Sequence, residues 1–190
     1  MAVGLVAPDV AQDVVADIAG ASAPPRRWFR RVRPVGTPGD AEADRQRVLA
    51  DARALLERAR ELVAVGWVQD AFYVVRDRRG RPQPVSPLGL VLLTRGDVVG
   101  ACLVGAVAHA ATGLDRRARR APAAYAVDAL SATLAEREGR APAPGTGHPA
   151  ERAARVRELA RWNDEPARQR AEVLDLLDRA VARTILAAVR

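Results

Sequence analysis

The feature that most constrains this chain is a run of apolar residues spaced three and four apart between residues 41 and 65. Such spacing places the apolar side chains on one side of an α-helix, which the rest of the protein must cover. The stripe is wider than a coiled-coil seam, which favours an intramolecular core, and Gly66 is typical of a helix end. Its members are Val48, Leu49, Ala52, Leu55, Leu56, Ala59, Leu62 and Val63.

The composition also favours helices that pack closely on one another. Apolar residues make up 49% of the 190 residues, but aromatic residues only 4%, so Ala, Val and Leu must build the core. We expect a mainly α (α+β) fold with about five or six helices and one β-hairpin. This compact domain should occupy residues 41–190, after an N-terminal helix and a basic Pro/Arg-rich arm in residues 1–40.

The middle of the chain carries both strand and helix signals. Aromatic and β-branched residues run from Trp67 to Val75, and Asp77 to Gly80 supplies turn chemistry, so a hairpin is expected near residues 67–85. Thr94 and Asp97 have capping-box spacing, which predicts a central, buried helix over about residues 97–112.

Three further helices are expected towards the C-terminus, near residues 124–136, near residues 151–160 and after residue 164. Either Asn163 or Asp164 can cap the last one, with Pro166 in its first turn. Its buried stripe should consist of Val173, Leu174, Leu177, Val181, Ile185 and Ala188.

All 30 basic residues are arginine, because the chain contains no lysine. This excludes Schiff-base catalysis and a phosphate-binding P-loop lysine. A GC-rich genome imposes the same bias towards Arg, Ala, Gly and Pro, so the net charge of +7 does not by itself indicate a nucleic-acid partner. With one cysteine, no signal-peptide pattern and no apolar run long enough for a bilayer, we expect a cytoplasmic protein without a membrane partner.

Several short motifs occur in an order that resembles a known family. They are Trp67-x-Gln69, Asp77-x-x-Gly80-Arg81-Pro82, Cys102-x-x-Gly105-Ala106, Trp162-Asn163-Asp164, Glu172-Val173-Leu174 and Ala180. In this order they resemble small, mostly actinobacterial proteins of the domain of unknown function 6197 family, over roughly residues 45–183. The resemblance implies a compact helical domain with a hairpin and brings no known activity.

Cys102, near the start of the central helix, has two interpretations. As the nucleophile of a thiol-dependent hydrolase or acyltransferase it would need His148 as base, with Gln69 and Asn163 as supporting amides. His109 lies seven residues on, about 10.5 Å along the helix axis, which is too far from the sulfur. The favoured interpretation is a small buried residue that lets helices approach, with Gln69 and Asn163 satisfying backbone groups and the tryptophans anchoring the core.

The favoured function is a non-catalytic interaction or accessory protein, with no metal and no cofactor. One cysteine and two histidines without paired spacing do not match a metal signature. The favoured partner is a protein with an acidic surface; a non-specific nucleic-acid partner and a homo-oligomer stay open as alternatives. The predicted partner-binding residues are Arg26, Arg27, Trp28, Phe29, Arg30, Arg31, Arg33, Arg78, Arg79, Arg116, Arg117, Arg119 and Arg120.

Overall fold

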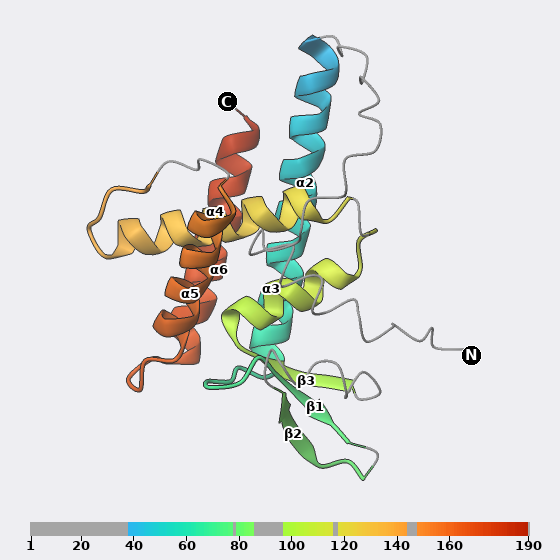
Figure 1. The fold of residues 1–190 in the computed structure, drawn as a ribbon, viewed down its shortest axis with the longest axis vertical. Helices are drawn as coiled ribbons and strands as arrows, with labels where there is room; N and C mark the ends of the chain where they lie inside the picture. The colour runs from blue at the N-terminus through green and yellow to red at the C-terminus, as the bar shows by residue number, and fades with distance from the viewer. Residues whose placement is uncertain (1–37, 78, 86–96, 116–117, 144–147, 190) are drawn as a thin grey trace.

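The computed structural model describes residues 38–77, 79–85, 97–115, 118–143 and 148–189. Within these residues the chain forms five helices and three strands, which confirms the predicted mainly α fold with some β structure. Of the N-terminal helix and arm predicted for residues 1–40, residues 1–37 lie outside the described residues, and residues 38–40 begin helix α2. Figure 1 shows the elements: α2 (Pro38–Val65), β1 (Tyr73–Arg76), β2 (Pro82–Val85), β3 (Asp97–Ala101), α3 (Leu103–Thr112), α4 (Arg120–Arg137), α5 (Pro149–Asn163) and α6 (Arg170–Ala188).

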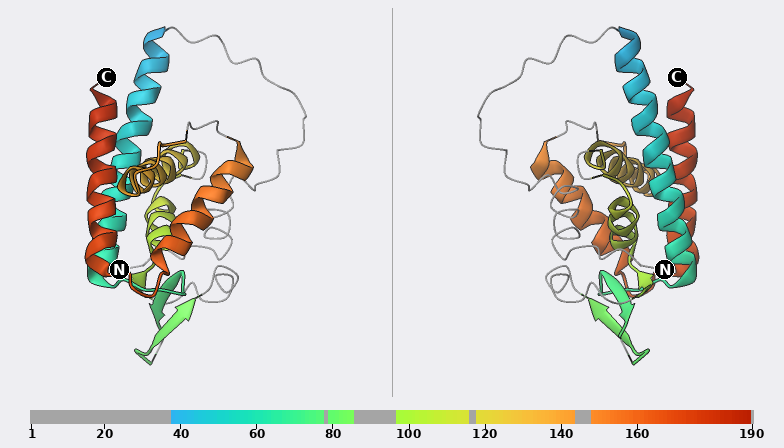
Figure 2. Two further views of the ribbon diagram at one scale, coloured as in Figure 1. Left: turned by 90° about the vertical axis from the view of Figure 1, so that its left-hand side faces the viewer. Right: turned by 90° about the vertical axis from the view of Figure 1, so that its right-hand side faces the viewer.

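Helices α2 and α6 lie side by side and antiparallel, as both views in Figure 2 show. Arg45 of α2 donates to the carbonyl of Ala187 at 2.7 Å, and Arg60 pairs with Asp178 at 2.5 Å. The buried face of α2 packs on α3 and α4. The structure buries six of the eight residues of the predicted stripe, each at most 3% exposed, and leaves Val48 and Leu62 half-buried. The buried six are Leu49, Ala52, Leu55, Leu56, Ala59 and Val63.

The predicted helix over residues 97–112 is wrong in its first turn. Residues 97–101 form strand β3, and α3 begins only at Leu103, with Cys102 as its N-cap. Val98 and Val99 suit a strand because β-branched side chains pack well on a pleated surface, and the antiparallel partner β1 is available to them. The remainder, α3, is central and almost wholly buried, as predicted.

The sheet has the order β2-β1-β3 with antiparallel pairing throughout. Strands β1 and β2 form the predicted hairpin, although the paired residues begin at Tyr73 and not at Trp67, which makes only an isolated bridge to Ala101. The third strand was not predicted. Pro82 and Pro84 are tolerated because β2 is an edge strand.

The last helix also begins later than predicted. Asn163 ends α5, and α6 starts at Arg170 with a capping box between Gln169 and Glu172. Its buried residues are Val173, Leu176, Leu177, Ala180 and Thr184, whereas Ile185 of the predicted stripe is 41% exposed. The predicted stripe therefore drifts off the buried face after Leu177.

Close packing of α3 on the sheet generates a test of the fold. A Cβ on Gly105 would lie 2.1 Å from the backbone oxygen of Phe72, whereas a Cβ on Gly113 would meet nothing closer than 3.6 Å. We expect Gly105→Ala to lower the free energy of unfolding by about 1–3 kcal/mol, because backbone must move. Gly113→Ala, the control, should leave it unchanged or raise it by up to about 1 kcal/mol. Urea unfolding measures both, and equal costs would contradict this packing.

Candidate functional site

Three of the four residues of the thiol-enzyme alternative come together from distant segments. Cys102 caps α3, Gln69 lies in the connection between α2 and β1, and Asn163 ends α5. The Asn163 Oδ1 accepts from the backbone N–H of Leu103 at 3.1 Å, directly after Cys102. The Gln69 side chain donates to the carbonyls of Asn163 at 3.0 Å and Glu165 at 2.8 Å.

The Asn163 side chain uses its full hydrogen-bonding capacity. Besides the Leu103 N–H, its Oδ1 accepts from the Trp67 indole at 2.9 Å. Its Nδ2 donates to the carbonyl of Val68 at 3.1 Å and to Asp164 Oδ1 at 2.7 Å. The amide is wholly buried and joins three segments, so it acts as a structural clamp. The prediction that Gln69 and Asn163 satisfy backbone groups is confirmed.

The Cys102 thiol is 5% exposed and lies in the hydrophobic core. Its Sγ accepts from the backbone N–H of Gly105 at 3.3 Å, and its own N–H donates to the carbonyl of Phe72 at 3.1 Å. Burial raises the pKa of the thiol to about 11, and the Gly105 N–H, which favours the thiolate, offsets only part of that effect. The thiol is therefore protonated at neutral pH.

Neither histidine lies beside the sulfur. His148 caps the start of α5, where its Nδ1 accepts from the N–H of Ala150 at 3.2 Å. Asn163 is the last residue of that helix, so about 22 Å of helix separates His148 from the Cys102 cluster. His109 packs edge-on against the Tyr73 ring with centroids 5.9 Å apart, and burial lowers the pKa of its imidazole.

A second cluster around Trp162 had not been predicted from the sequence. The guanidinium carbon of Arg168 lies 4.0 Å from the Trp162 ring centroid, and that of Arg137 lies 5.6 Å away. Glu172 accepts hydrogen bonds from both arginines. Arg168 and Glu172 are four residues apart near a helix start, a spacing typical of ion pairs, and this was the sequence signal that could have indicated the cluster. This cluster fixes the loop between α5 and α6.

The hairpin turn is organised by one carboxylate. Asp77 Oδ1 accepts from the N–H groups of Arg79 and Arg81, each at 2.8 Å. These backbone hydrogen bonds, that of Arg81 first, lower the pKa of Asp77. Gly80 has φ +75°, a conformation that glycine adopts without strain. The turn is thus preorganised, and Arg76, Arg79 and Arg81 are exposed on it.

The predicted arginine surface is only partly described. Arg79 and Arg120 are exposed, whereas Arg119 is 2% exposed, so Arg119 does not belong to a surface patch. The other predicted partner-binding residues lie outside the described residues: Arg26, Arg27, Trp28, Phe29, Arg30, Arg31, Arg33, Arg78, Arg116 and Arg117. Across the described ranges, no group of three or more His, Cys, Asp or Glu residues is placed to hold a metal ion. No described helix is long and apolar enough to cross a bilayer.

The buried thiol predicts a specific alkylation profile. We expect iodoacetamide to modify Cys102 in the folded protein far more slowly than in denatured protein, with no plateau at low pH, because the thiolate reacts. The folded pKa of about 11 exceeds the unfolded value of roughly 8.5. The contribution of the buried, protonated thiol to the free energy of unfolding is therefore fully present below about pH 8.5 and is lost as the pH rises towards 11. Cys102→Ala should lack this loss between about pH 8.5 and 10, below the range in which the buried Tyr73 hydroxyl, whose pKa burial also raises, contributes a loss of its own. Fast alkylation of Cys102 at pH 7 would refute the assignment.

The clamp predicts a large cost for losing the Asn163 amide. Asn163→Ala leaves the Trp67 and Leu103 N–H groups without their partner, so we expect the free energy of unfolding to fall by more than about 2 kcal/mol. Asn163→Asp keeps the acceptor but places a second carboxyl beside Asp164. The loss in free energy of unfolding caused by Asn163→Asp should become smaller as the pH falls, because the two neighbouring carboxyl groups then share a proton. Denaturant titrations at pH 5 and 7 test this; a pH-independent deficit would contradict it.

Comparison with known proteins places these residues in a family. Residues 40–183 match the family described as Family of unknown function (DUF6197). No curated protein and no solved structure matches the chain. The matched range contains the Asn163 clamp, the Asp77 turn and the Trp162 cluster, and it leaves out the predicted N-terminal arm. Because the match covers most of the 190 residues of the chain, the chain belongs to the DUF6197 family of unknown function.

Proposed function

We propose that this protein is a cytoplasmic, non-catalytic accessory protein that binds a partner with an acidic surface through its hairpin tip and its arginine-rich arm. The observation that carries the proposal is the turn held by Asp77. Residues 76–81 contain four arginines and one aspartate, and that aspartate is committed to backbone N–H groups and to Arg81. We also propose an actinobacterial origin for the protein, as the resemblance implies.

The position of the tip supports a binding role. Figure 1 shows the β1–β2 hairpin projecting beyond the helices at one end of the molecule. The Arg81 side chain is 62% exposed, and Arg76 donates to the carbonyl of Gly80 at 2.9 Å, within the same turn. A preorganised turn loses less conformational entropy when it binds than a mobile loop does. Its guanidinium groups therefore suit pairing with carboxylates on a partner.

The environment of Cys102 supports the non-catalytic part of the proposal. A nucleophilic cysteine needs a stabilised thiolate and a base within hydrogen-bonding reach. Here burial raises the pKa of the thiol, and the base of the alternative, His148, lies at the far end of α5. A packing role for Cys102 accounts for both observations, since small residues at this point admit Phe72 and Tyr73 against α3.

The shape of the basic surface favours a protein partner over a nucleic acid. The tip is compact, and many other arginines of the described helices pair with neighbouring carboxylates, as Arg53 does with Glu57 and Arg179 with Asp175. A nucleic-acid backbone is usually followed by a longer basic stripe. In the proposal Arg120 and the arm, with Arg26, Arg27, Trp28, Phe29, Arg30, Arg31 and Arg33, extend the contact, together with Arg78, Arg116 and Arg117.

Binding of charged probes tests the role of the tip. We expect a fluorescent poly-glutamate peptide to bind the full chain, and the double variant Arg76→Ser, Arg79→Ser to bind several-fold more weakly. Both residues are exposed, and Asp77 keeps its hydrogen bonds from the backbone N–H groups of Arg79 and Arg81. The variant loses the Arg76 hydrogen bond to the Gly80 carbonyl, but the bonds to Asp77 should hold the turn. The charge-matched control, Arg53→Ser with Arg179→Ser, should bind nearly as the unmodified chain does.

Two results would overturn this assignment. Equal weakening by the tip variant and by its control would show that only net charge matters. Tighter binding to a mixed-sequence DNA duplex than to the peptide, with a log-log salt slope that loses about 0.9 for each phosphate contact removed, would identify a nucleic-acid partner instead.

A further inference from the structure

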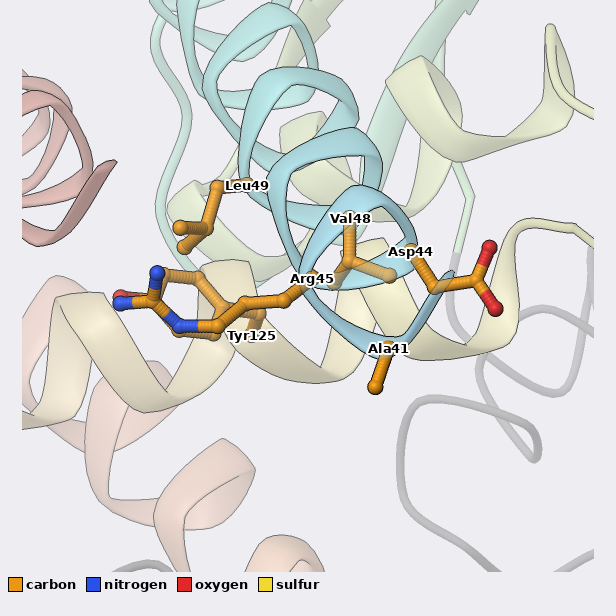
Figure 3. Close-up of a pocket in the computed structure, with 6 residues that line it drawn as sticks. All are labelled: Ala41, Asp44, Arg45, Val48, Leu49 and Tyr125. Atoms are coloured by element: carbon orange, nitrogen blue, oxygen red, sulfur yellow. The ribbon is translucent and has the colours of Figure 1, made fainter. Parts of the chain in front are cut away.

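A pocket of about 330 Å³ lies between the first turns of α2 and helix α4. In Figure 3, Arg45 and Leu49 point to the side of α2 on which Tyr125 of α4 lies, whereas Asp44 points the other way. This volume is at the lower end of the range for sites that enclose a small ligand, so it suits one large side chain. The lining residues are Ala41, Asp44, Arg45, Val48, Leu49 and Tyr125.

The lining of the pocket suits an aromatic ring. Leu49 is 3% exposed and continues the core, while Val48 and Tyr125 are half-buried. Arg45 is held along the pocket by its hydrogen bond to the carbonyl of Ala187. A guanidinium beside an indole is favourable, and the same molecule already pairs them where Arg168 stacks on Trp162.

The rim of the pocket is acidic. Asp40, Glu42 and Asp44 lie in the first two turns of α2. Glu42 and Asp44 pair with Arg45 and Arg47 but keep 56% and 72% of their side chains exposed. Hydrogen bonding from Gln46 lowers the pKa of Glu42. Residues 40–47 carry three acidic residues against two arginines, so this part of α2 has an excess of negative charge. An apolar floor with an acidic rim calls for an aromatic residue flanked by cations.

The chain itself supplies such a sequence close by. We propose that Trp28, within the hexapeptide Arg-Arg-Trp-Phe-Arg-Arg of residues 26–31, inserts into this pocket while its flanking arginines face Asp40, Glu42 and Asp44. Trp28 and Phe29 are the aromatic residues of residues 1–37. The linker from Phe29 to Thr37 can span about 30 Å, whereas the pocket lies about 5–17 Å along α2 from Pro38. Pro34 and Gly36 suit the reversal that this path requires.

Docking gives the arm a fixed place on the domain without any partner. One consequence rests on the proposed function: an acidic partner that recruits the arm must compete with the acidic residues of α2 for the same arginines. The two ideas are separable, because docking is measured on the protein alone and partner binding on the hairpin variants.

Tryptophan fluorescence tests the docking in the full chain. The signal of Trp28 is the difference between the unmodified chain and Trp28→Phe. We expect blue-shifted emission and a Stern–Volmer constant for acrylamide several-fold below that of free N-acetyl-tryptophanamide. Ala41→Arg, which fills the pocket, should raise this constant to the free value. The matched control is Ala50→Arg, which lies on the opposite side of α2 because nine residues correspond to two and a half turns; it should leave the constant unchanged.

Each other outcome overturns the proposal. Quenching of Trp28 like that of the free indole in the unmodified chain would show an undocked arm and would leave the pocket to another ligand. Protection that persists in Ala41→Arg would place Trp28 elsewhere. Protection lost on dilution, in step with dissociation of a dimer by sedimentation, would show that a second copy provides the pocket. Both alanines are exposed, so neither substitution disturbs the core, and thermal unfolding of the two variants verifies this.

Discussion

The architecture depends on the buried side-chain amide of Asn163. Its oxygen accepts from the backbone at the start of α3 and from the Trp67 indole, and its nitrogen donates to the connection after α2. These groups lie 60, 96 and 95 residues from Asn163 in sequence, and each would be costly to bury without a partner. One side chain therefore ties the connection after α2 and the start of α3 to the end of α5. The Trp162 ring, one residue earlier, contacts Arg137 and Arg168. Both arginines donate to Glu172 of α6, so this cluster connects the end of α5 to α6.

The helices could be predicted where amphipathic periodicity was strong, as in α2, whose apolar positions lie on the buried face. Periodicity failed where a segment is apolar on all sides. Residues 98–108 form one run without charged or polar side chains across β3 and α3, and only the presence of β1 as an antiparallel partner makes the first part a strand. Asn163 and Asp164 misled for a different reason. Residue types that cap helix starts also bridge loops, and these two side chains serve the connection of residues 67–70.

For the candidate site, the sequence sufficed to group Gln69, Cys102 and Asn163, but it also grouped His148, which lies at the far end of α5. The favoured role of the amides as partners of backbone groups agrees with the hydrogen bonds. It could not reveal that Arg119 is buried, because arginine is usually exposed and nothing local marks the exception. Nor could it reveal the contacts of Arg137 and Arg168 with the Trp162 ring, which connect α4 and the loop before α6 to the end of α5. Contacts between distant segments leave no periodic trace.

The two prolines of β2 have a consequence for how any partner can approach the hairpin. Pro82 and Pro84 are two residues apart and so lie on the same side of an edge strand, and neither has an N–H to donate. An extended peptide cannot form a regular hydrogen-bond ladder on the side of β2 where the two prolines lie, because neither of them offers a backbone N–H. The β2 edge of the sheet is thereby guarded against intermolecular strand addition and the aggregation that follows from it, and recognition at this edge must use side chains.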